Sequence, residues 1–196
     1  MSTEHEPPLD ERERLDLCDL LDELGPDAPT LCEGWTTLDL AAHLVLREHF
    51  SKWTDEKRAV EKAKGLPALT ARLRAGAPAL PWRIPGVRNL LNGTEYLIHH
   101  EDVRRANGLA PRTGRPDLDK IAWATVRLTA RGTARRIRPH GLEISTRAGE
   151  SRHYGPPGGA VLTGHPVELL LYLSGRRDAS ETDLTGDPEA VAALRR

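Results

Sequence analysis

The sequence predicts a mainly α-helical protein that ends in a small α+β unit. Up to about His140, apolar residues recur three and four positions apart, which is the spacing of one face of an α-helix. Residues that favour helix starts and stops bound several of these segments. After His140, short apolar runs alternate with turns rich in glycine and proline, as in strands and their connections. We therefore expect a bundle of four main helices followed by a smaller mixed unit.

The first predicted helix has a complete apolar stripe. Asp10 is expected to be its N-cap, with Glu13 as the capping-box partner three residues later. Four leucines follow at the spacing i, i+3, i+4 and i+7, namely Leu17, Leu20, Leu21 and Leu24. Gly25 and Pro26 are expected to end the helix, because neither residue continues a helix well.

The second predicted helix carries a histidine on its apolar side. Thr36 is expected to begin this helix, with Asp39 at the matching capping position. His43 lies beside Leu40 and Leu44 on one face. The helical pattern extends as far as residue 63, and we expect one continuous helix over this stretch.

The remaining elements follow from the same kinds of signal. We expect helices over residues 68–74, within 87–107, and over 118–135, 166–174 and 188–194, and strands over 142–147, 160–163 and 182–185. The stretch 155–159 is expected to be a hairpin connection between the first two strands. The expected domains are a helical bundle over residues 1–110, and a linker, a helix and a small α+β domain over residues 111–196.

The composition argues against several functional classes. The net charge of −1 gives no general attraction to nucleic acid, and the basic stretch 131–138 lacks the interleaved aromatic residues that single-stranded nucleic acid stacks on. No apolar run approaches the roughly 20 residues that span a bilayer. The first ten residues are polar and acidic, without the apolar core of a signal peptide. We expect no nucleic-acid or membrane partner and a cytoplasmic location.

A carboxylate and an imidazole stand four residues apart in the helix predicted within residues 87–107. At this spacing Glu95 and His99 share one helix face, with Cβ atoms roughly 6 Å apart, and can bind one ion together. Both side chains are suitable zinc ligands. The alternative is local, with Asn92 as the N-cap and Glu95 as its capping-box residue. Spacing alone leaves both interpretations open.

His43 on another predicted helix makes a metal site more plausible. On its own, a histidine on an apolar face is more often a core residue that is satisfied by a hydrogen bond. Helical bundles, however, commonly build metal sites from inward side chains on facing helices. Two histidines and one glutamate leave a fourth position open, which is the form of catalytic rather than structural zinc sites.

Two segments carry a pattern of a known family. In residues 33–44, a Trp, a capping Thr and an Asp precede His43, and in residues 95–106 a Glu-x-x-x-His is followed three residues later by Asp. Both segments resemble the metal motifs of the mycothiol-dependent maleylpyruvate isomerase, DinB-like superfamily. The resemblance implies a DinB-like four-helix bundle with His43, Glu95 and His99 as ligands of a divalent metal, zinc. The string His-His-Glu-Asp-Val-Arg-Arg-Ala is similar to an uncharacterised actinobacterial branch described only as metal-binding.

A third segment, residues 141–176, is similar to the small C-terminal domain of these isomerases. That domain ends in a leucine-rich helix and a Gly-Arg pair, which here is Gly175 and Arg176. The resemblance implies that Arg176 binds the carboxylate of the substrate, a task for which the two parallel donors of a guanidinium are suited. The alternative is a surface arginine that the helix dipole favours near a C-terminus.

The function that the resemblance implies is a metal-dependent transferase or isomerase. It would use a low-molecular-weight thiol, mycothiol, on a small electrophilic substrate, with the thiol at the open metal position. Maleylpyruvate itself is not expected, because the C-terminal domain is short and Glu101 stands where the isomerases often carry an aromatic residue. The alternatives are a metal-dependent hydrolase and a non-catalytic metal- or thiol-binding stress or sensor protein.

Three neighbours of these residues have less specific interpretations. His100 is about 100° around the helix from His99, so both cannot easily face one ion. Asp102 could orient the ring of His99 or pair with one of the arginines that follow it, and we favour the arginine. Cys32 precedes the second helix and could reach the metal, but simple packing is favoured.

Overall fold

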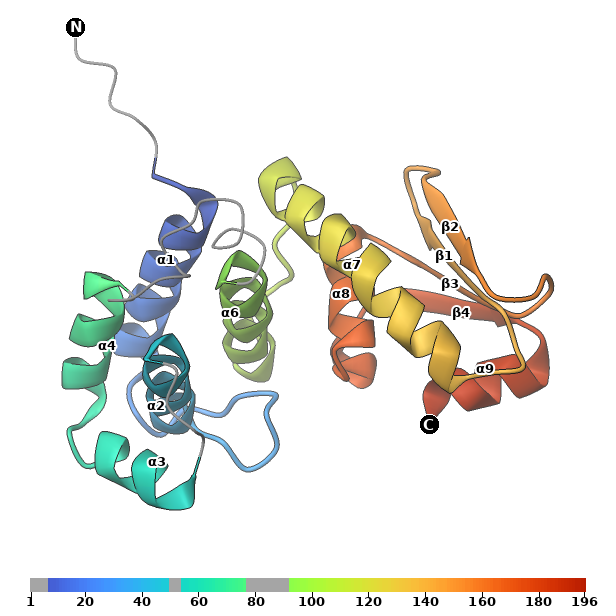
Figure 1. Ribbon diagram of the computed structural model, residues 1–196. Helices are drawn as coiled ribbons and strands as arrows, with labels where there is room; N and C mark the ends of the chain where they lie inside the picture. The colour runs from blue at the N-terminus through green and yellow to red at the C-terminus, as the bar shows by residue number, and fades with distance from the viewer. Residues whose placement is uncertain (1–6, 50–53, 77–91) are drawn as a thin grey trace, which may run out of the picture. The chain divides into compact units, whose positions relative to one another are not determined.

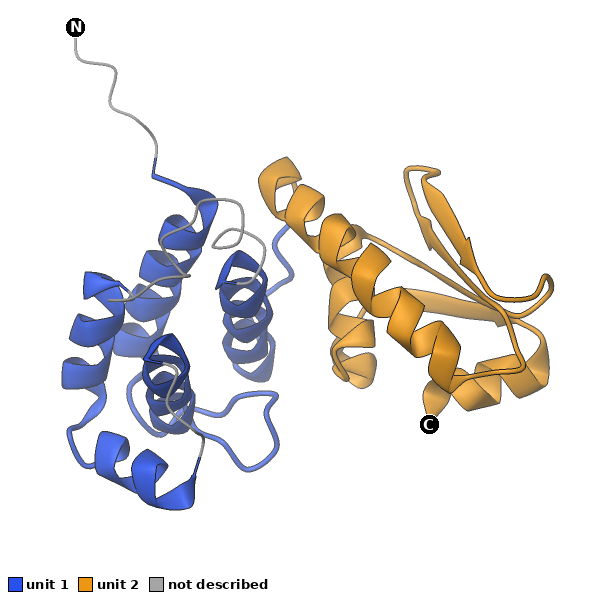
Figure 2. Cartoon of the chain, viewed as in Figure 1, with its two compact units in different colours: residues 1–113 blue, residues 114–196 orange. Residues whose placement is uncertain are grey.

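The computed structural model of the chain describes residues 7–49, 54–76 and 92–196. The chain divides into two compact units, residues 1–113 and residues 114–196, which Figure 2 shows in blue and orange. The first unit is helical and the second combines helices with a four-stranded sheet. The predicted fold class, mainly α with a small α+β part at the C-terminal end, is therefore confirmed. In the part of the chain that the structure describes, no helix combines the length and the apolar character needed to cross a membrane.

The first unit is built from helices around a leucine-rich core (Figure 1). Its described helices are α1 (Leu9–Leu24), α2 (Thr37–Glu48), α3 (Asp55–Lys62), α4 (Leu66–Ala75) and α6 (Thr94–Ala106). The core joins the apolar faces of α1, α2 and α4 to Tyr96 and Val103 of α6. This packing fixes α2 and α6 in position, and these two helices carry the predicted metal ligands.

The start of α1 differs from the prediction, whereas its apolar stripe is confirmed. The helix begins at Leu9 after Pro8 and has no side-chain cap, so Asp10 lies inside the first turn instead of capping it. Glu13 is fully buried and bonds to Arg112, which lies far along the sequence. The leucines of the stripe pack into the core, and the helix ends at Gly25 as expected.

The predicted start of α2 is confirmed and the predicted continuous helix is wrong. Thr36 and Asp39 form a capping box, in which the Thr36 backbone donates to the Asp39 carboxylate at 3.2 Å. The helix ends at Glu48. Thr54 is extended (φ −132°, ψ 154°), and its side chain accepts from the Lys57 backbone to cap a separate helix, α3. Residues 50–53 of the predicted continuous helix lie outside the described residues.

Two other helices of the first unit agree with the prediction. The short helix expected over residues 68–74 is α4, which extends a little further at each end. The helix expected within residues 87–107 is α6, which ends just before Asn107. Residues 87–91 lie outside the described residues. No helix or strand occupies residues 107–115, and the unit boundary falls there.

The second unit packs helices against a four-stranded sheet. It contains α7 (Pro116–Arg136), β1 (Leu142–Thr146), β2 (Ser151–Tyr154), β3 (Ala160–Gly164), α8 (Pro166–Leu173), the 3₁₀ helix η2 (Arg177–Ala179), β4 (Thr182–Gly186) and α9 (Pro188–Arg195). The strand order is β2-β1-β3-β4, with β1 and β3 parallel and the two outer pairs antiparallel. Alternate residues of β1 and β3 are buried, as the period of a half-covered strand requires.

One connection in this sheet differs from the prediction. Residues 155–159 do not form a hairpin between neighbouring antiparallel strands, because they lead from β2, on one side of β1, to β3 on the other. The chain passes so close to itself here that a Cβ atom on Gly159 would overlap the Gly141 backbone. The glycines therefore allow a close backbone approach, and the hairpin turn lies between β1 and β2.

Candidate metal centre

The three predicted ligands come together from two helices of the first unit. α2 carries His43 between Leu40 and Leu44, which are both buried in the core. α6 carries Glu95 and His99, one helical turn apart. Because the apolar residues of both helices hold the backbones in place, the three polar side chains meet beside the core.

The distances in this group suit a small divalent ion. Glu95 Oε1 lies 3.3 Å from Nε2 of His43 and 3.3 Å from Nε2 of His99. The three potential ligand atoms all lie within 4.8 Å of one another. Two ligand atoms that are each about 2.0–2.1 Å from a tetrahedral ion are separated by about 3.3 Å. The donor set and its spacing therefore fit zinc without a large rearrangement.

The group is buried on one side and accessible on the other. The side chain of His99 is 9% exposed, whereas those of His43 and Glu95 are 23% and 29% exposed. The ring of Trp35 lies against His43, with centroids 5.2 Å apart. Three protein ligands with a partly open side are the arrangement of a catalytic rather than a structural zinc site.

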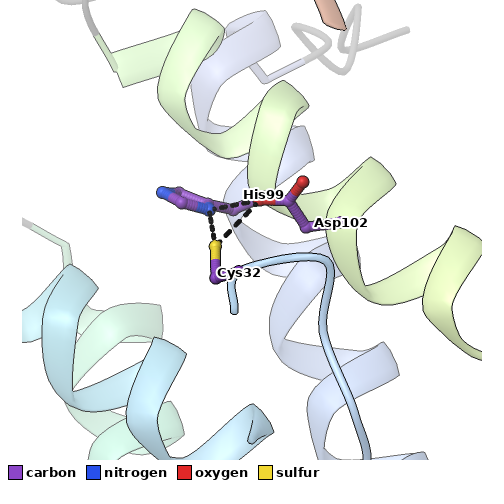
Figure 3. Close-up of side chains that lie close together, drawn as sticks. All are labelled: Cys32, His99 and Asp102. Carbon is purple, nitrogen blue, oxygen red and sulfur yellow. Dashed lines mark hydrogen bonds and ion pairs between the residues drawn. The ribbon is translucent and has the colours of Figure 1, made fainter. Parts of the chain in front are cut away.

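The other ring nitrogen of His99 is held by a buried carboxylate. His99 Nδ1 and Asp102 Oδ2 are 2.9 Å apart, and the Cys32 thiol donates to the same oxygen at 3.3 Å (Figure 3). Asp102 is completely buried. When Nδ1–H donates to Asp102, the lone pair of Nε2 is directed to the side of Glu95 and is available to an ion.

Cys32, His99 and Asp102 could also hold an ion among themselves. We favour the position at Nε2, because the 2.9 Å contact between His99 and Asp102 is a direct hydrogen bond, shorter than the separation of two ligands around one ion. The expectation for Asp102 is corrected in the same way. Its contact is with His99, whereas the arginine side chain of Arg105 donates to Glu101 at 2.9 Å.

The capping alternative for Glu95 is not what the structure has. α6 has Gly93 at its N-cap and no side-chain capping bond. The Asn92 side chain instead accepts a hydrogen bond of 2.9 Å from Nη1 of Arg47. Arg47 also places Nε 3.4 Å from Glu95 Oε1. Sequence reasoning missed this arginine, although its position one turn after His43 could have suggested it.

The electrostatics keep the Glu95 carboxylate ionised. Burial by itself raises its pKa, but hydrogen bonds from His43 and His99 and the positive charges of His99 and Arg47 outweigh that effect. Together they hold the pKa of Glu95 far below its ordinary value. A permanently charged carboxylate is what a divalent cation requires of a ligand.

His99 is shifted in the opposite direction. Burial lowers the pKa of its imidazole, but hydrogen bonds to Asp102, Cys32 and Glu95 and the charge of Glu95 raise that pKa to about 10. Without an ion, His99 is therefore protonated at neutral pH. An ion at Nε2 must displace this proton, so metal binding is expected to weaken as the pH falls.

The two other residues singled out from the sequence have different surroundings. His100 is buried and lies 3.4 Å from Glu13, away from the three ligands. Arg176 belongs to the second unit, where its Nη1 donates to the Ser174 carbonyl at 2.7 Å. The structure therefore brings together His43, Glu95 and His99.

Comparison with known proteins places this arrangement in a fold. Two crystal structures of the mycothiol-dependent maleylpyruvate isomerase, one of them a mutant, match 97% of this chain and 99% of their own chains. The TM-scores are 0.59 for the mutant and 0.60 for the other structure, at 19% and 18% sequence identity. The chain has the fold of that isomerase. No protein-family model matches the sequence, and no curated protein matches it either.

Proposed function

We propose that this chain binds one divalent metal ion, zinc, through His43, Glu95 and His99, and that it is a metal-dependent thiol transferase or isomerase. Its thiol is of low molecular weight, mycothiol by likeness to the isomerase, and its substrate is a small electrophile. The observation that supports this most is the 3.3 Å spacing of Glu95 Oε1 from both imidazole nitrogens, on the accessible side of the helices. A bound divalent ion lowers the pKa of a thiol that it holds, and so supplies thiolate at neutral pH.

The protein groups around this centre have separate tasks. Asp102 fixes the ring of His99 so that Nε2 is directed to the ion. Arg47 keeps Glu95 in place and balances its charge. The leucines beside His43 keep the inner side of the site dry, which strengthens the electrostatic interactions there. The substrate and the thiol approach from the exposed side.

Arg176 is proposed as the group that holds the substrate carboxylate. Its guanidinium offers two parallel donors to two oxygen atoms. The proposal requires it to exchange the Ser174 carbonyl for the substrate. An Arg176→Lys variant is expected to raise KM for a carboxylate-bearing substrate more than it lowers kcat.

Neither cysteine is needed as the nucleophile. Cys18 is buried, and burial raises the pKa of its thiol to about 12, so it is unreactive at neutral pH. Cys32 donates to Asp102. Cys18→Ser and Cys32→Ser are therefore expected to keep activity, since serine can replace the hydrogen bond that Cys32 donates.

The test is thiol binding by the metal-loaded protein. Calorimetry with mycothiol, in two buffers of different ionisation enthalpy, measures the affinity and counts the protons released. The thiol is expected to bind and to release about one proton near neutral pH. If metal-loaded protein binds no thiol at millimolar concentration, the transferase or isomerase proposal is wrong, and a hydrolase or a sensor takes its place.

A further inference from the structure

A polar cavity lies within the last part of the second unit. It has a volume of about 410 Å³ and is formed by the end of α8, by η2, by β4 and by the end of α9. The polar residues that line it are Tyr172, Arg177, Asp178, Ser180, Thr182 and Arg195. All of them come from residues 172–195, so the cavity does not depend on any residue of the candidate metal centre.

Two buried polar atoms at this cavity have no hydrogen-bond partner within the described residues. They are the hydroxyl oxygen of Tyr172 and Nε of Arg177. Tyr172 is only 6% exposed, so its hydroxyl has little access to water. A buried polar group without a partner costs about 1–3 kcal/mol and is uncommon in native proteins. A ligand that accepts hydrogen bonds would remove this cost from both groups.

The charges around the cavity favour an anion. The guanidinium of Arg177 lies over the ring of Tyr172, 5.9 Å from its centroid. Arg177 and Arg195 form no ion pair with any residue in the described part of the chain. Asp178 is the one acidic residue among those that line the cavity, so two positive charges and one negative charge leave a net charge of about +1. Burial raises the pKa of Tyr172 against the opposing effect of both arginines, and its hydroxyl is a donor at neutral pH.

We propose that this cavity binds the carboxylate group of a small organic acid. The two oxygens accept from Arg177 and from the hydroxyl of Tyr172, and Arg195 adds positive charge. A net charge of about +1 matches a carboxylate better than a phosphate, and a guanidinium presents two parallel donors to a planar group. The site is separate from Arg176, whose side chain bonds to the Ser174 carbonyl.

The experiment uses the full chain and two probes, benzoate and inorganic phosphate. Amide and arginine Nε–H signals in ¹⁵N–¹H spectra report binding. Benzoate is expected to shift the Nε–H signal of Arg177 and the amides of residues 172–184 in a saturable manner, and phosphate is not. Arg177→Gln is expected to weaken benzoate binding by roughly tenfold, since a hydrogen bond to a charged group is lost. Tyr172→Phe should weaken it by a smaller factor.

Matched controls distinguish the cavity from general charge effects. Arg131→Gln removes an exposed arginine of α7, and Tyr154→Phe removes a hydroxyl that donates to the Arg127 carbonyl. Neither control is expected to change benzoate binding. The proposal is wrong if phosphate alone binds, if Arg177 Nε does not respond to benzoate, or if the controls weaken binding as much as Arg177→Gln.

A second measurement tests the unpartnered hydroxyl directly. Because the hydroxyl of Tyr172 has no partner in the ligand-free protein, Tyr172→Phe is expected to leave Tm unchanged or to raise it. Benzoate should then stabilise the unsubstituted protein more than the variant. A clear fall in Tm without ligand would mean that the hydroxyl already has a partner, and would overturn the proposal.

Discussion

Two adjacent histidines on α6 face two different charged clusters of the first unit. His99 lies with Glu95 and His43 in the candidate metal centre, where part of the cluster is exposed. His100 lies beside Glu13 in a cluster whose carboxylates are fully buried. The residue types are the same, glutamate and histidine. The two clusters differ in how the carboxylates are neutralised and in their access to solvent.

The buried cluster is closed by arginine. Arg112 donates from Nη1 to both oxygens of Glu13 at 2.9 Å and from Nε to Glu101 at 2.7 Å. Arg105 donates to the second oxygen of Glu101 at 2.9 Å. Each buried carboxylate therefore has a guanidinium that cannot leave without exposing an uncompensated charge. This cluster stabilises the fold and leaves no position for an ion.

The candidate metal centre is compensated more weakly. Glu95 shares one oxygen between two imidazoles at 3.3 Å, and its arginine, Arg47, is 3.4 Å away. These contacts are longer than those of the buried cluster, and the side chains are partly accessible. The comparison indicates that glutamate and histidine bind metal where arginine does not already complete their interactions.

The largest expected effect belongs to the buried cluster. Arg112→Met leaves Glu13 and Glu101 buried with less compensation, and should lower the free energy of unfolding by about 3–5 kcal/mol. Urea denaturation measures this, with the exposed Arg131→Met as the control, expected to cost less than about 0.5 kcal/mol. The folded fraction of Arg112→Met should still bind metal. A loss below about 1 kcal/mol would show that the cluster is not the stabilising one.

A smaller effect is expected at the support of the metal centre. Asp102→Asn weakens the hydrogen bond that orients His99, and should reduce zinc affinity by about 10–100-fold. Competition with a chelator of known affinity measures this loss. Glu13→Gln, on the other side of α6, is the matched control and should leave zinc affinity unchanged. Equal losses in both variants would mean that the two clusters are not functionally separate.

The smallest effect concerns the pH dependence of stability. Burial raises the pKa of Glu13, but His100 and Arg112 outweigh it and hold the pKa below its ordinary value in the folded protein. This stabilisation is present above the unfolded pKa and is lost as the pH falls through the folded pKa. Glu13→Gln should therefore flatten the decline of stability below about pH 4.5. An unchanged acid decline, measured by urea denaturation at several pH values, would contradict this assignment.

Local spacing was enough to predict the helices that hold the site. The leucine stripe of α1 and the capping box of Thr36 and Asp39 depend on residues within one or two turns, so the sequence displays them directly. Glu95 and His99 are likewise one turn apart. Their meeting with His43 required the family resemblance, because periodicity does not say which helices face each other.

The features that were missed depend on distant contacts or carry weak local signals. Arg112 is 99 positions from Glu13, so their pairing leaves no local pattern. β2 consists mainly of exposed polar residues and lacks the alternation that marks a strand. No glycine or proline separates α2 from α3, and the extended Thr54 gave no visible stop signal. The contact of Asp102 with His99 had a suitable spacing, but arginines nearby offered an equally reasonable partner.

The most direct test of the central claim is the metal content of three single variants. Elemental analysis of the purified, zinc-reconstituted protein should give one ion per chain. His43→Asn and His99→Asn should each lose it, whereas His100→Asn, which changes the neighbouring histidine, should retain it provided that circular dichroism shows it folded. Full metal retention in both His43→Asn and His99→Asn would contradict the assignment of His43, Glu95 and His99 as the metal ligands.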